Sequence, residues 1–302
     1  VGGEGSAING TWTILGGVEV TIQDVELVSE TSDYLMSISD PDNIVLLKNV
    51  VLTSTGNGII MQGDSANTQL ILDSTTVISQ AAANGRAIAV RGGGNHVVIE
   101  SNSTVLTTGG SGAATIHINT AVLENTAAID IRSSTVISER YYSLFAWAGT
   151  TDMNITDSIV KGYAAIYLKP DSENTIQISG SEIVGMTRYT GVSDQFGAIV
   201  TEGSNNMISA DNGTVIANEY LDGATAGEQL LLFSSYGTGT GNVIQLGEAT
   251  LQNTNNDAAA VFSGYNTLQN QVTAAATTRF LEESGEPAPV LYTAAGVLLN
   301  AI

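Results

Sequence analysis

Two clusters of carboxylates are the groups of this chain whose types and spacing could do chemistry. The first consists of Asp40, Asp42 and Asp64, and carboxylate oxygens are the ligands that Ca²⁺ prefers. Asp40 and Asp42 lie in the segment SDPDN, where aspartate also serves to form a turn. We keep these three residues as the calcium candidate, but we expect a turn there and predict no metal or cofactor.

The second cluster consists of Asp152, Asp157 and Asp171, with Lys161 and Lys169 nearby in the sequence. Glycoside hydrolysis requires two carboxylates at about 5–9 Å from each other. Asp152 and Asp157 lie on one expected strand and its corner, so their side chains should point to different sides. We therefore predict no catalytic residues, and cleavage of an acidic polysaccharide by this cluster remains the alternative.

Motifs for nucleophilic catalysis and phosphate binding do not support an enzyme either. The chain has no Cys and no G-x-S-x-G segment, and its two histidines, His96 and His117, do not lie in a triad context. The glycine-rich segments 92–94 and 109–112 are not followed by a helix start with Lys, which a phosphate-binding loop requires. We interpret both segments as turns, and we interpret an outward histidine on a strand as solvated.

The elements that must position these residues repeat about every 25 residues. Equivalent apolar anchors are Ile22, Leu47, Leu72, Ile99, Ile131, Ile155, Ile178, Ile208, Leu246 and Leu268. A second apolar residue follows most anchors by five positions, whereas Val105 follows Ile99 by six and Val215 follows Ile208 by seven. A fixed period of this length predicts a solenoid, in which each repeat buries its apolar face against its neighbours.

One repeat, residues 95–119, shows what each turn of the solenoid should contain. Residues 96–100 alternate apolar and polar side chains, a Ser/Asn corner follows, and residues 104–106 form a second short segment. A glycine-rich turn then leads to a third alternating segment at residues 114–118. Three short strands with turns between them predict an all-β, right-handed parallel β-helix of about ten rungs.

Asparagine recurs at one corner of the predicted coil, four residues before the anchor of several repeats. These residues are Asn43, Asn95, Asn174 and Asn242. Because asparagine tolerates left-handed backbone angles and hydrogen-bonds its neighbours, we expect a structural ladder along this corner.

The repeat pattern predicts a single domain over residues 1–302. We expect an N-terminal cap at 1–17, rungs at 18–272 and a C-terminal capping segment at 273–302, with a short helix within 274–284. Longer repeats place loops at 189–195, 220–228 and 236–241. The two ends of the coil need covers, because open ends expose backbone groups that pair with other chains.

Composition and charge exclude several classes of partner. The chain carries 30 acidic and 9 basic residues, a net charge of −21, so neither nucleic acid nor an anionic membrane surface is an expected partner. No apolar stretch reaches the roughly 18 residues that span a bilayer, so we expect no membrane insertion by this segment. The absence of Cys is compatible with a secreted or cell-surface location.

The repeat length, the three strands per rung and turns such as SNST and SSTV resemble the right-handed parallel β-helices of the pectate-lyase-like superfamily. The resemblance covers roughly residues 18–272. Within that superfamily the Thr/Asn/Gly-rich composition is most similar to bacterial autotransporter passenger domains and surface adhesins. The resemblance implies adhesion to a glycan or to a host or neighbour-cell surface protein, and in some members hydrolysis.

A strip of outward residues on the third strand is the candidate binding site. The inward pairs Ile88/Val90, Ile116/Ile118, Leu144/Ala146 and Ile166/Leu168 align successive rungs. The outward positions then form two columns, Ala89, His117, Phe145 and Tyr167 beside Arg91, Asn119, Trp147 and Lys169. Exposed aromatic rings with cations and amides beside them suit a sugar. The alternative is a second core, covered by segments 139–143 or 189–196.

The sequence thus predicts a secreted or cell-surface binding protein without enzymatic activity, with an adhesin-like role. The ligand-binding residues that we predict are Arg91, His117, Phe145, Trp147, Tyr167 and Lys169. The alternatives are a lyase or glycosidase and a structural subunit. In the structural reading, copies associate end to end through the first rung and the tail at 296–302.

Overall fold

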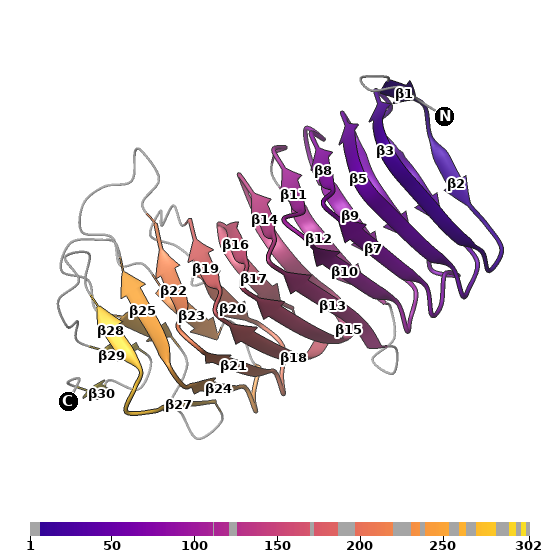
Figure 1. Ribbon diagram of the computed structural model, residues 1–302. Coiled ribbons are helices and arrows are strands. Elements are labelled where there is room, and N and C mark those ends of the chain that lie inside the picture. Colours follow the sequence, from indigo (N-terminus) through magenta and orange to yellow (C-terminus); the bar gives the residue numbers. More distant parts are fainter. Residues whose placement is uncertain are drawn as a thin grey trace.

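A computed structural model describes residues 7–110, 112–120, 126–169, 172–186, 197–219, 231–235, 239–253, 260–263, 270–281, 290–293 and 297–299. Throughout these residues the protein is an all-β parallel solenoid (Figure 1). The chain winds along one axis, from β1 at one end to β30 at the other, and each turn stacks on the turn before it. The predicted fold class is confirmed, and each turn of the central part contains three strands, as expected.

Three ladders of parallel strands run along the axis. The first ladder passes through the N-terminal halves of β3 (Glu19–Ser29) and β5 (Ile44–Ser54), then β7 (Gln69–Asp73), β10 (His96–Glu100), β13 (Thr126–Arg132), the C-terminal half of β15 (Tyr142–Thr156), β18 (Ser172–Ser179), β21 (Met207–Asp211), β24 (Val243–Leu246) and β27 (Gln271–Ala274). Adjacent parallel strands lie about 4.8 Å apart, so residues 25 or more positions apart become direct neighbours.

The second ladder lies beside the first, beyond one corner of the coil. It passes through β1 (Ala7–Asn9), the C-terminal halves of β3 and β5, β8 (Thr76–Ser79), β11 (Thr104–Thr107), β14 (Thr135–Ser138), β16 (Ile159–Gly162), β19 (Glu182–Gly185), β22 (Thr214–Asn218), β25 (Ala249–Asn253) and β28 (Arg279–Leu281).

The third ladder closes each turn and carries the candidate site. It passes through β2 (Trp12–Ile14), β4 (Tyr34–Ile38), β6 (Asn57–Met61), β9 (Arg86–Val90), β12 (Ala114–Asn119), the N-terminal half of β15, β17 (Ala164–Leu168), β20 (Ile199–Thr201), β23 (Leu231–Ser235), β26 (Ala260–Ser263) and β29 (Val290–Thr293). The last strand, β30 (Val297–Leu299), pairs antiparallel with β29.

The boundaries of the ladders differ from those expected. β1 and β2 already pair with β3 and β4, so the coil begins ahead of residue 18. The expected helix within 274–284 is wrong, because Arg279–Leu281 forms β28 and Phe280 pairs with Leu251 on β25. The loops expected at 189–195 and 220–228, and the first half of 236–241, lie outside the described residues.

The inward residues of the three ladders form one hydrophobic core, and most of the predicted anchors lie in it in the expected register. From Ile22 to Ile178 the first-ladder anchors pair as predicted. Ile208 is the exception, because it pairs with Ile176, and the true partner of Ile178 is Ala210. The second-ladder partner of Ile183 is likewise Ile216, while Val215 pairs with Glu182. The expected anchor Leu268 lies outside the described residues, and Leu246 pairs with Ala274.

The asparagine ladder is confirmed from Asn174 onward and extends to residues that were not predicted, but Ala127 and Thr151 occupy the equivalent positions before Asn174. Asn206 Oδ1 accepts hydrogen bonds from the backbone N–H and from Nδ2 of Asn174, at 3.1 and 2.7 Å. Asn206 Nδ2 donates in turn to Asn242 Oδ1 at 2.8 Å, and Asn242 N–H donates to Asn270 Oδ1 at 3.0 Å. Asn206, Asn242 and Asn270 therefore each satisfy a buried backbone N–H of the turn before their own. Asn206 and Asn270 were not predicted, because they lie four residues before Ala210 and Ala274, whereas the predicted anchors were Ile208 and Leu268.

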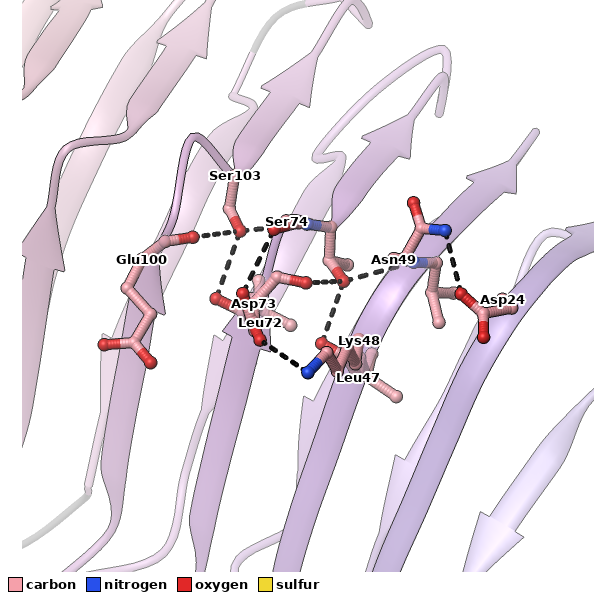
Figure 2. A network of polar contacts seen from close by, with 11 residues as sticks. Asp24, Leu47, Lys48, Asn49, Leu72, Asp73, Ser74, Glu100 and Ser103 are labelled. Carbon is pink, nitrogen blue, oxygen red and sulfur yellow. Dashed lines mark hydrogen bonds and ion pairs between the residues drawn. The ribbon is translucent and has the colours of Figure 1, made fainter.

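A hydroxyl ladder lies at the corner between the first and second ladders (Figure 2). Thr75 N–H donates to Ser103 Oγ at 3.0 Å, and Ser103 Oγ donates to the carbonyls of Leu72 and Glu100 at 3.1 and 2.6 Å. In the first three turns, one residue beside this corner adopts a left-handed backbone, with φ values of 53° at Asp24, 51° at Asn49 and 52° at Ser74. Asn49 Nδ2 donates a hydrogen bond to Asp24 Oδ1 on the adjacent turn, at 2.9 Å.

We predict that Asn206→Ala lowers the free energy of unfolding by about 1–3 kcal/mol, because it leaves buried backbone and amide groups of Asn174 and Asn242 without partners. Chemical denaturation followed by circular dichroism measures this change. The control is Gln245→Ala on the exposed side of β24, which should change stability by less than about 0.5 kcal/mol. Equal effects of the two substitutions would contradict a stabilising asparagine ladder.

Candidate functional site

The outer face of the third ladder brings the predicted strip together in the expected register. His117 pairs with Ala89 on one side and with Phe145 on the other, and Phe145 pairs with Tyr167. The column continues from Tyr167 to Val200 on β20. The inward alignment on Ile88, Ile116, Leu144 and Ile166 is therefore correct, and it places these side chains on consecutive turns.

Most of this column is not the open stacking surface that we expected. Phe145 is 6% exposed, Tyr167 is 2% exposed and His117 is 6% exposed. The rings pack on one another, with centroid distances of 5.4 Å from Phe145 both to His117 and to Tyr167. Tyr142 adds a further ring at 4.8 Å from Phe145 and 4.6 Å from Tyr167. These residues form a second, small hydrophobic core outside the coil.

The cover of this second core comes partly from the segment named in the alternative interpretation. Tyr141 and Tyr142 belong to residues 139–143, and their rings lie 4.3 Å apart in an edge contact. Burial raises the pKa of the Tyr142 hydroxyl far above its usual range, so this side chain stays neutral. The other proposed cover, 189–196, lies outside the described residues.

A hollow of about 710 Å³ lies beside this core, which is within the size range of small-ligand sites. Aromatic side chains and hydrogen-bonding groups both contribute to its wall. Its lining consists of Asn84, Arg86, Gly112, His117, Asn119, Tyr141, Tyr142, Phe145, Trp147, Tyr167, Lys169 and Glu202. Five of the six predicted binding residues therefore line one hollow.

Trp147 is the accessible aromatic of the hollow, with 45% of its surface exposed. The register shifts at this point, because Asn119 pairs with Ala148 and Trp147 is the extra residue of a bulge. A bulge redirects the side chain that it inserts. The ring lies edge-on to Phe145 at 5.5 Å, and Lys169 Nζ lies 4.1 Å from its centroid. The second predicted column is thus present but irregular.

Charged groups of opposite sign line the hollow on different turns. Arg86 begins β9 and donates from NH1 to the hydroxyl of Tyr34 at 3.4 Å. Glu202 follows β20, and the hydroxyl of Tyr167 donates to its Oε2 at 2.7 Å. From β9 to β20 the third ladder advances by four strands, so Arg86 and Glu202 lie on distant turns, and Lys169 adds a second cation after β17, one strand before β20.

His117 is held neutral in the wall of the hollow. Burial, together with the positive charges of Arg86 and Arg91, lowers its pKa from 6.5 to about 3. Arg91, the sixth predicted residue, is exposed and does not belong to the lining of the hollow. It acts on the site through its charge, and direct contact with a ligand there is not supported.

The carboxylates considered for catalysis are not brought together. Asp152 is exposed on the first ladder, between its strand neighbours Ala128 and Thr175. Lys161 lies on the second ladder and forms an ion pair with Glu219. Lys169 follows the third ladder, on a different face. Asp171 lies outside the described residues.

The calcium candidate is likewise not supported by the geometry. Asp40 and Asp42 adopt left-handed φ values of 64° and 60°, and Asn67 Nδ2 donates to Asp42 Oδ1 at 3.5 Å. This is the turn chemistry that we expected. In the part of the chain that the structure describes, no three His, Asp or Glu side chains form a group able to hold a metal ion.

Sequence reasoning missed Arg86, Tyr142 and Glu202. Tyr142 pairs with Ala114 and Ala164 and lies three residues before Phe145 on the same outer face. Two consecutive residues point inward at this point of each turn, which breaks the period of two. The sequence does carry a signal for these two consecutive inward positions, which is a small residue followed by Ile or Leu at 87–88, 115–116, 143–144, 165–166 and 198–199.

His96, which we expected to be solvated, belongs to a polar cluster on the first ladder. Its Nε2 lies 3.1 Å from Asp130 Oδ2, which also accepts from Arg132 at 2.8 Å, and Asn154 Nδ2 donates to Asp130 Oδ1 at 2.9 Å. Burial raises the pKa of Asp130, but hydrogen bonds from Asn154 and His96 and the charge of Arg132 outweigh it, so the pKa lies below its usual value. All groups of the cluster are paired, which indicates a structural role.

Comparison with models of known protein families, with curated proteins and with solved structures finds no match to this chain. Over the described residues, no helix has the length and apolar character needed to span a bilayer. The candidate site is therefore interpreted from its own geometry.

We predict that His117→Phe weakens the acid sensitivity of the fold. The unfolded chain binds a proton at His117 below about pH 6.5, whereas the folded protein binds it only near pH 3. The unfolded state thus holds more protons in this window, and stability falls as the pH is lowered through it. The free energy of unfolding of the variant, from denaturation at pH 7 and pH 4, should fall less than that of the original protein. Equal losses would contradict a buried neutral imidazole.

Proposed function

We propose that this protein binds a carbohydrate in the hollow on the third ladder and performs no chemistry on it. The observation that carries the proposal is the half-exposed ring of Trp147 in a hollow whose other aromatic side chains are already packed. An aromatic ring that remains accessible on a rigid strand offers a flat apolar surface, which suits the face of a sugar ring.

Hydrogen-bonding groups surround this ring and support a hydroxyl-rich ligand. Asn84, Asn119, Arg86 and Glu202 all line the hollow. Lys169 lies against Trp147, so a ligand meets a cation and an aromatic ring at one position. An apolar wall with a few polar groups at fixed positions is the usual composition of a small-ligand site.

The distribution of carboxylates favours binding over cleavage. Glycoside hydrolysis uses two carboxylates on either side of the scissile bond. Among the lining residues that the structure describes, Glu202 is the carboxylate, and its Oε2 already accepts a hydrogen bond from Tyr167. Asp152 lies on the first ladder, and Asp157 lies at the corner between β15 and β16. A lyase or glycosidase remains the alternative, and end-to-end assembly as a structural subunit is a further one.

We also propose a location and a family. The parallel ladders, with three strands in each turn, support a relationship to the pectate-lyase-like superfamily and to the passenger domains of surface adhesins. The negative charge and the absence of Cys are compatible with a secreted or cell-surface protein. In such a setting a rigid solenoid would display the hollow to a glycan on a host or neighbouring cell.

The test is a glycan array, followed by titration of the strongest oligosaccharide. The chain has two tryptophans, so a Trp12→Phe variant leaves Trp147 as the one source of tryptophan fluorescence, which should change on binding. Trp147→Ala should weaken binding by about tenfold, equivalent to about 1.4 kcal/mol, because a half-exposed ring is lost from the contact surface.

Trp12→Phe serves as the matched control, because Trp12 lies on β2 at the first turn and should leave the affinity unchanged. A chelator in a parallel array tests for a dependence on Ca²⁺, and we expect none. No binding across the array, or equal affinity of the Trp147→Ala variant, would overturn the proposed function. Turnover of an acidic polysaccharide would favour the enzyme instead.

A further inference from the structure

The imidazole of His117 leaves a buried nitrogen without a partner in the wall of the hollow. The residue is 6% exposed, and its Nδ1 is enclosed with no hydrogen-bond partner. Of its two ring nitrogens, Nδ1 is the one enclosed in this way. Buried polar groups without partners are rare in native proteins, because each loses its hydrogen bonds to water without replacement. The enclosed Nδ1 restricts which tautomer the ring can adopt.

The surroundings of the ring decide which nitrogen carries its proton. Burial keeps the ring neutral, so it holds a single N–H. An enclosed N–H without an acceptor is less tolerable than an enclosed lone pair. The proton therefore resides on Nε2, and Nδ1 keeps the lone pair. Since His117 lines the hollow, Nε2–H is the group of this ring that can reach a ligand.

We propose that His117 determines the specificity of the hollow by donating a hydrogen bond from Nε2–H to a hydroxyl oxygen of the bound sugar. This inference rests on the proposed function and names the atom that recognises the ligand. Neighbouring groups fit the same role, because Arg86 offers guanidinium donors and Asn84 and Asn119 offer amide donors. The sugar would place an acceptor oxygen against these donors while its apolar face lies on Trp147.

The column itself offers a substitution that removes the donor and preserves the shape. The next position along the ladder is Phe145, so a phenylalanine ring is compatible with this face of the coil. Replacing His117 by Phe also removes the buried nitrogen that lacks a partner. The variant should therefore be at least as stable as the original protein at pH 7. A role in packing alone predicts no loss of affinity in a variant that is equally or more stable.

The experiment has an arm that needs no ligand. Nitrogen-15 NMR of the imidazole rings at pH 7 reports the protonated nitrogen, and a His96→Gln variant assigns the two histidine signals. We expect His117 to be neutral with its proton on Nε2. A proton on Nδ1, or a charged ring, would overturn the inference whatever the protein binds.

The second arm measures the affinity for the oligosaccharide with the strongest signal on the array. His117→Phe should weaken binding by about tenfold without loss of stability, while His96→Gln on the first ladder should leave it unchanged. Analogues that lack single hydroxyls should lose affinity for the original protein at one position, and this loss should vanish in His117→Phe. Unchanged affinity of the variant overturns the inference but leaves the proposed function intact. Failure of every glycan to bind overturns both.

Discussion

The structure depends on one constraint, which is that successive turns stack in register about 4.8 Å apart. Every polar group at a corner of the coil then meets the same corner of the next turn, and it must find its partner there. The asparagine ladder does this inside one corner, where Oδ1 of Asn206, Asn242 and Asn270 each accepts from the backbone of the preceding turn. The hydroxyls of Thr75 and Ser103 do the same at another corner (Figure 2). Without these columns, each turn would bury unpaired backbone groups.

The same stacking creates the candidate site. Because His117, Phe145 and Tyr167 occupy one column, their rings are brought together although they are 22 to 28 residues apart. The aromatic rings of this column pack on one another and form a second core. Phe145 of this core contacts the ring of Trp147, which remains exposed. The bulge at Trp147 interrupts the register by one residue and leaves that side chain accessible. The site is therefore a local departure from the repeat, held in place by the regular turns around it.

The period of the sequence predicted the fold and most of the register, because inward residues alternate with outward ones and recur at each turn. Two errors follow from this same alternation. A shift of two residues keeps every side chain on its original face, so Ile208 and Ala210 are equally acceptable from pattern alone. Burial of Phe145 and Tyr167 was predicted only as the alternative, since it depends on Tyr142, which reaches the outer face where two residues in a row point inward. The contributions of Arg86 and Glu202 depend on the geometry of turns that are far apart in the sequence.

The register at Ile178 tests the central claim most directly, because there the structure departs from the simple repeat of the sequence. Gln177 pairs with Ser209 in the structure, whereas the alignment of Ile178 with Ile208 would pair it with Met207. The chain has no Cys, so paired cysteines can be introduced without background. Oxidation of the Gln177→Cys/Ser209→Cys variant, read by mass spectrometry without reduction, should yield a disulfide, because in-register neighbours lie within its reach. Preferential bridging in the Gln177→Cys/Met207→Cys variant would contradict the stacking described.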